Sequence, residues 1–101
     1  MADAQTDIER YACRAIREAA WAIEAWLREI TVARDRQSLW RDRVAGLVQK
    51  REAEGVTAFD ITNARLEWLH AQSDTLHAVV AWRIAQVKLK QAQGLLASNS
   101  R

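Results

Sequence analysis

Two histidines lie seven residues apart in the second half of this 101-residue chain. On a helix, His70 and His77 share one side but are separated by about 10.5 Å along the axis. One chain therefore cannot place both imidazoles on a single metal ion, and no carboxylate or sulfur motif accompanies them. We predict packing roles for the two histidines and no metal site.

Three carboxylates recur with the same spacing at Asp60, Glu67 and Asp74. This regularity favours salt bridges to arginines of a neighbouring helix over acid–base catalysis, because paired catalytic acids converge in a pocket. The single Cys13 has no paired base and fits a small packing position. No glycine-rich phosphate loop or nucleophile elbow is present. We predict no catalytic residue, no cofactor and no enzymatic activity.

The basic residues are most frequent between Arg34 and Arg51, but Asp35 and Asp42 dilute them. A solvated, ion-paired helix face is expected there. The net charge of only +2 argues against nucleic acid as a partner. No apolar run approaches the roughly 18 to 20 residues that span a bilayer, so we expect no membrane insertion by this chain. The first residues lack signal-peptide features, and the chain as written is expected to be soluble and unexported.

The chain is organised around one predicted turn at residues 54–57. Gly55 tolerates positive φ and suits the residue that closes a helix. Thr57 and Asp60 are spaced as a capping box, and Val56 can pack on Ile61 as a hydrophobic staple. One helix therefore ends here and another begins, and the short connection makes them antiparallel.

The absence of proline leaves little to interrupt long helices on either side of this turn. The first helix is predicted from about residue 6 to about residue 53, beginning at a Thr6–Glu9 capping box and passing through Gly46. The second is predicted from residue 58 to about residue 97. Residues 1–5 and 98–101 are expected to be disordered. The predicted fold is all-α, a long antiparallel two-helix coiled-coil hairpin that self-associates into a helical bundle.

The second helix carries two apolar stripes on opposite sides, where a lone hairpin can bury only one. The first stripe consists of Phe59, Leu66, Leu69, Leu76, Val80, Ile84 and Val87. The second, the alanine seam, is a heptad pattern of Ala64, Trp68, Ala71, Thr75, Ala78, Trp82, Ala85, Leu89, Ala92 and Leu96. The first helix has a weaker second stripe of Trp21, Ala25, Val32 and Leu39.

Burying both stripes requires more than two helices, and a bare hairpin has too small an interior for a stable monomer. We assign the alanine seam to pairing with a second copy. The expected assembly is a homodimer that forms an antiparallel four-helix bundle.

The turn and second helix resemble the last periplasmic helical hairpin of the TolC-type outer-membrane efflux protein family. The similar stretches are KREAEGVTAFDITNARL at 50–66, AWRIAQVKL at 81–89 and AQGLL at 92–96. The resemblance implies a non-catalytic structural hairpin of a transport channel, with Gly55, Val56 and Thr57 docking a periplasmic adaptor protein. It implies a periplasmic location if the chain is an excised piece of such a channel. The chain departs from the family in having no β-barrel strands, no second hairpin and a shorter spacing from Gly55 to Asp60.

The alternative is a small cytoplasmic homo-oligomeric helical bundle that acts as a scaffold or regulator. In that case the resemblance reflects shared coiled-coil composition.

Overall fold

The chain forms an all-α hairpin of two long helices, which confirms the predicted fold class. The computed structural model describes residues 4–52 and 55–99. Helix α1 covers Ala4–Lys50 and helix α2 covers Ala58–Asn99. Helix α1 continues through Gly46 without a break, as its flanking helix-forming residues require. Neither helix is long and apolar enough, within the described residues, to cross a membrane.

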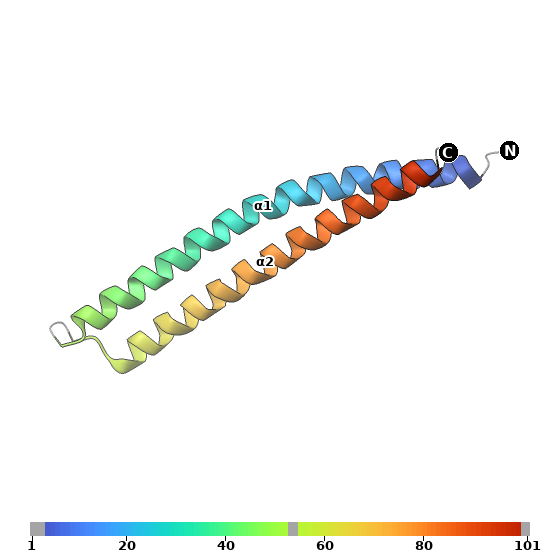
Figure 1. Cartoon of the computed structure of the whole chain (residues 1–101). Coiled ribbons are helices and arrows are strands. Elements are labelled where there is room, and N and C mark those ends of the chain that lie inside the picture. Colours follow the sequence, from blue (N-terminus) through green and yellow to red (C-terminus); the bar gives the residue numbers. More distant parts are fainter. Residues whose placement is uncertain (1–3, 53–54, 100–101) are drawn as a thin grey trace. The chain divides into compact units, whose positions relative to one another are not determined.

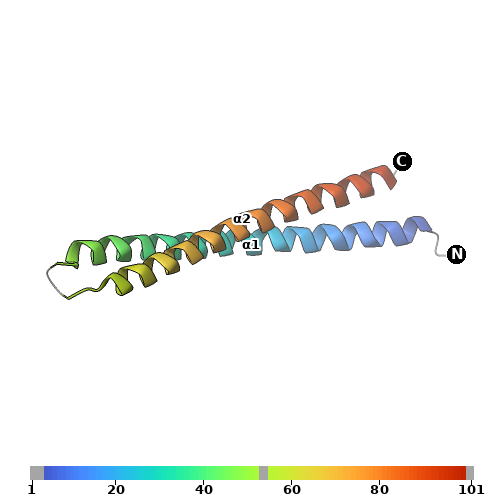
Figure 2. The ribbon, with the colours of Figure 1, turned by 90° about the horizontal axis from the view of Figure 1, so that it is seen from below.

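The hairpin divides into two compact units, and each unit contains one segment of α1 and one segment of α2. The tip unit is Arg28–Ala78 and includes the connection between the helices. The terminal unit consists of Met1–Leu27 and Val79–Arg101, and contains the ends of the chain. In both views of the ribbon, the α1 and α2 segments of the tip unit lie side by side and run antiparallel (Figure 1, Figure 2).

The core of each unit is built mainly from alanine. In the terminal unit, Ala12 and Ala19 of α1 are buried, as are Ala85 and Ala92 of α2. In the tip unit, the buried apolar residues are Ile30, Ala33, Val44, Ile61, Ala64, Ala71 and Ala78. Because alanine extends no further than Cβ, small residues on both helices allow the two backbones to approach closely.

This burial corrects our assignment of the alanine seam to an exposed surface. All five heptad alanines, Ala64, Ala71, Ala78, Ala85 and Ala92, are at most 7% exposed within the single chain. The alternating residues Trp68, Trp82, Leu89 and Leu96 are half-buried. The seam therefore forms the interface between α2 and α1 of the same hairpin. The other stripe of α2, which runs from Phe59 to Val87 and is called the outer stripe from here on, is exposed.

The helix ends also differ from the prediction. Helix α1 begins at Ala4, so Thr6 lies inside the helix and does not cap it, while α2 continues past residue 97 to Asn99. Two reciprocal hydrogen bonds join these ends: Gln5 Nε2 donates to the Asn99 carbonyl (3.3 Å), and Asn99 Nδ2 donates to the Gln5 carbonyl (3.2 Å). Residues 4–5 and 98–99, which we expected to be disordered, are therefore helical.

Candidate functional site

The tip of the hairpin has the local geometry that its sequence predicts. Gly55 has φ = +70°, the left-handed conformation that glycine adopts without strain. The Thr57 N–H donates to Asp60 Oδ2 (3.0 Å), and the Asp60 N–H donates to Thr57 Oγ1 (3.2 Å). These two bonds are a capping box, in which each side chain satisfies an orphan donor of the first helical turn. These bonds define the first turn of α2 from Thr57 to Asp60.

The three tip residues present a small surface. Gly55 and Thr57 are exposed, and Val56 is half-buried. A Cβ added at Gly55 would meet no atom within 4 Å. A side chain at this position is therefore disfavoured by the positive φ of the backbone and not by a steric clash with neighbouring residues. The predicted packing of Val56 on Ile61 stays a prediction. The first residue of the predicted turn, Glu54, lies outside the described residues.

The outer stripe of α2 consists of large apolar side chains that are all exposed. Its seven side chains are between 46% and 70% exposed. Four of them, Phe59, Leu66, Leu69 and Leu76, belong to the tip unit; the other three, Val80, Ile84 and Val87, belong to the terminal unit. Helix α1 adds further exposed apolar side chains, including Trp21 at 70%, Leu39 at 63% and Val32 at 49%.

The large apolar side chains of the hairpin are therefore mostly exposed, and the small ones are mostly buried. Among the described residues, eleven apolar residues are buried, and eight of them are alanine. Fifteen large apolar residues are exposed over the same part of the chain. Monomeric soluble proteins rarely expose large contiguous apolar patches, so these exposed side chains are a candidate interaction surface.

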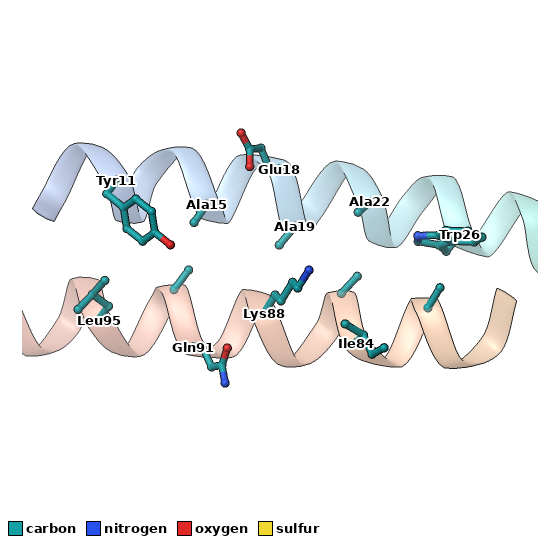
Figure 3. Close-up of a pocket in the computed structure, with 13 residues that line it drawn as sticks. Tyr11, Ala15, Glu18, Ala19, Ala22, Trp26, Ile84, Lys88, Gln91 and Leu95 are labelled. Atoms are coloured by element: carbon teal, nitrogen blue, oxygen red, sulfur yellow. The ribbon is translucent and has the colours of Figure 1, made fainter. Parts of the chain in front are cut away.

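A groove of about 850 Å³ lies between the two helix segments of the terminal unit. Its floor consists of alanines, including Ala15, Ala19 and Ala85, and larger side chains border it. Figure 3 shows Trp26 at one end of the groove and Lys88 extending toward α1, while Gln91 points away from it. Sequence reasoning missed this groove, although alanines facing alanines predict shallow space where no large side chain fills the surface.

The candidate chemical groups do not converge. His70 and His77 are exposed, and Cys13 is exposed as well. Within residues 4–52 and 55–99, no group of three or more His, Cys, Asp or Glu side chains is placed to hold a metal ion. Of the three regularly spaced carboxylates, Asp74 lies 3.9 Å from the Arg36 guanidinium, an exposed pair that contributes little to stability.

Comparisons of the chain with protein-family models, with characterised proteins and with solved structures found no match. The resemblance of residues 50–66 to the efflux-channel hairpin stays a prediction from those residues. The geometry of the chain establishes an all-α hairpin with exposed apolar side chains along α2.

Proposed function

We propose that this chain is a non-catalytic structural and interaction hairpin that self-associates through the outer stripe of α2. The observation that carries the proposal is the exposure of all seven large side chains of that stripe, while the interior consists mainly of alanine. Burying alanines contributes little apolar area per residue. The hairpin therefore has a strong free-energy gain available from covering its outer face.

The size of this free-energy gain determines how strongly a single substitution in the stripe should weaken association. Fully burying a large apolar side chain contributes about 1.5 to 3 kcal/mol, so a half-exposed one has about 1 kcal/mol left to gain. Two copies with seven such residues each gain on the order of 10 kcal/mol, which is comparable with the cost of association of about 4 to 15 kcal/mol. Association then needs most of the stripe to be covered at once.

A charge in the middle of the stripe should therefore separate the copies without unfolding the hairpin. Leu76 is 65% exposed in the single chain, so L76E removes few intrachain contacts but buries a carboxylate on association. We expect L76E to raise the dissociation constant at least 30-fold, about 2 kcal/mol, and to leave the helical circular dichroism unchanged. Light scattering at tens of micromolar should give a mass near the 11.5 kDa of one chain.

The matched control is Q93E, which adds the same charge at an exposed position of α2 outside the stripe. This variant should keep the mass of the unaltered assembly. A mass near 11.5 kDa for the unaltered chain at the same concentration would refute self-association.

A second function, docking of a periplasmic adaptor protein at the tip, is favoured by the ordered geometry of residues 55–60. Under this proposal the hairpin serves in an efflux assembly and the same stripe pairs it with other hairpins. The alternative of a homo-oligomeric scaffold or regulator uses the stripe but gives the tip no partner. Binding at the tip therefore discriminates between these two functions.

Altering the tip should weaken adaptor binding while the hairpin remains folded. G55L forces a side chain into φ = +70° and distorts the tip, whereas G55N keeps a residue type that tolerates this conformation. We expect binding of an adaptor helical hairpin, measured by calorimetry, to fall at least fivefold with G55L and with V56A, and less with G55N. Equal affinity for all folded variants would remove the docking role.

A further inference from the structure

The exposed face of α2 in the tip unit has a pattern that reads the same in both directions. Its four large apolar residues follow one another at intervals of seven, three and seven positions: Phe59, Leu66, Leu69 and Leu76. Two hydroxyl residues complete the face, Thr62 three positions after Phe59 and Ser73 three positions before Leu76. All six occupy the a and d positions of one heptad repeat, so they share one side of the helix. We call these six residues the tip face.

The side chains of the tip face are open to a partner. The four apolar residues are between 46% and 70% exposed, and both hydroxyl residues are exposed. The alanines that pack against α1 in this unit, including Ala64 and Ala71, lie on the other side of α2. All six residues belong to the tip unit. An interface made by the tip face therefore needs only this one compact unit and leaves the packing of its two helix segments intact.

A face with this symmetry is complementary to itself under a two-fold axis. In a two-fold interface, residue i of one copy contacts residue j of the other, and j contacts i. Reversing α2 about the point between residues 67 and 68 matches each residue with one of similar character. The matched pairs are Phe59 with Leu76, Thr62 with Ser73, and Leu66 with Leu69. A shift by one heptad would place a hydroxyl residue against a leucine, so the hydroxyl pair fixes the register.

The two hydroxyl groups can satisfy each other when the face is covered. Thr62 Oγ1 donates its hydrogen to the Ala58 carbonyl within α2 (2.9 Å), so this oxygen is left as an acceptor. The exposed Ser73 hydroxyl is able to donate. In the reversed alignment, Ser73 of one copy donates to Thr62 of the other. Burial of this layer then leaves neither hydroxyl without a partner.

The residues that flank the tip face favour the antiparallel direction. In an antiparallel coiled coil, each flank meets the same flank of the partner, which brings Arg65 beside the uncharged Gln72. A parallel pair would instead bring Arg65 of each copy beside His70 of the other, so two bases would meet. The carboxylate of Asp74 lies toward Arg36 of α1 and stays outside this interface.

We infer that the tip unit pairs with the tip unit of a second copy, with the two α2 segments antiparallel and the two-fold axis between residues 67 and 68. This inference rests on the proposed self-association and specifies its direction and register.

The area of the tip face is sufficient for a specific but reversible dimer. With about 200 Å² for a phenylalanine and about 130 Å² for a leucine side chain, the four apolar residues expose roughly 350 Å² on each copy. Two copies together then cover about 700 Å² of apolar surface. Since apolar atoms make up about 60% of an interface, the whole contact buries about 1,200 Å². This value is the lower end of the range for specific protein–protein interfaces.

Disulfide cross-linking tests the direction and the register. In a Cys13→Ser background, T62C and S73C each place one thiol on the tip face and leave its apolar side chains unchanged. The two positions lie about 16 Å apart along one helix, but antiparallel copies bring them within the Cα separation of under about 7 Å that a disulfide needs. We expect the mixture of the two variants to form at least tenfold more linked dimer under mild oxidation than either variant alone. S38C, at an exposed position of α1, is the control for random collision.

The outcomes separate this inference from the proposal on which it rests. Efficient linkage of T62C alone and of S73C alone would show parallel copies. A dimeric mass without linkage in the mixture would show that another surface, such as α1 of the second copy, covers the tip face. Either result overturns the inference and leaves self-association standing. A monomeric mass for the unaltered chain overturns both.

A double-mutant cycle gives a second readout that needs no cysteine. T62L or S73L alone places a leucine against a hydroxyl residue of the other copy, whereas T62L/S73L makes this layer apolar on both sides. We expect the double variant to dimerise at least tenfold more tightly than the two single effects predict together. Independent effects of the two substitutions on the dissociation constant would contradict contact between residue 62 of one copy and residue 73 of the other.

Discussion

Replacing Ala78 by glutamate should unfold the hairpin, because this alanine is 1% exposed at the interface of α2 with α1. The new side chain overfills a close-packed seam and buries a charge without a partner. We expect the free energy of unfolding to fall by at least about 3 kcal/mol, measured by chemical denaturation followed by circular dichroism.

The control for A78E is A45E, which makes the same change at an exposed alanine of α1 in the same unit. It should alter the free energy of unfolding by less than about 0.5 kcal/mol. If A78E only lowered the mass of the assembly and left the stability of the hairpin intact, the alanine seam would be an interface between chains after all.

Replacing Trp82 by alanine should be the other costly change, with a loss of about 3 kcal/mol in the free energy of unfolding. The indole is half-buried beside the alanines of the seam, and the Arg83 guanidinium lies 5.4 Å from its ring centroid. The Trp82 Nε1 is buried and has no hydrogen-bond acceptor among the described residues. A buried donor without an acceptor contributes unfavourably, so W82F should change stability by less than about 1 kcal/mol.

The pair W82A and W82F separates packing from hydrogen bonding at one position. Near-equal losses for the two variants would mean that the indole N–H, and not the ring, stabilises the interface. Trp68 offers an independent repeat in the tip unit, since its Nε1 is also buried without an acceptor in the described part of the chain.

The hairpin and its tip follow from local features of the sequence, and these are the parts that were predicted well. Gly55 has the positive φ that its place in the turn requires, and Thr57 and Asp60 form the expected capping box. Both depend on residues within three positions of each other. Local backbone preferences are therefore enough to specify them.

The expectation that a single hairpin leaves the alanine seam exposed was wrong, because periodicity shows which residues share a face but not what that face packs against. The missing signal lay in the first helix, where Ala12, Ala19 and Ala33 recur at heptad spacing and match the small residues of α2. The contact between Gln5 and Asn99 was not predictable either, since 94 residues separate the two. Neither side chain carries a local pattern that identifies its partner.

The strict repeat of the alanine seam has a consequence for alignment. Sliding α2 along α1 by one heptad, about 10.5 Å, would again bring alanine to the places that alanine left. Packing along such a seam discriminates poorly between the two alignments. The alignment is fixed by features that do not repeat. The seam positions Trp68, Thr75 and Trp82 exchange tryptophan for threonine on such a shift, and the seven-residue connection at 51–57 and the Gln5–Asn99 contact add to the discrimination. The length of the connection therefore helps to fix the alignment of α2 along α1. A longer connection would allow the two helices to pack with a shift of one heptad.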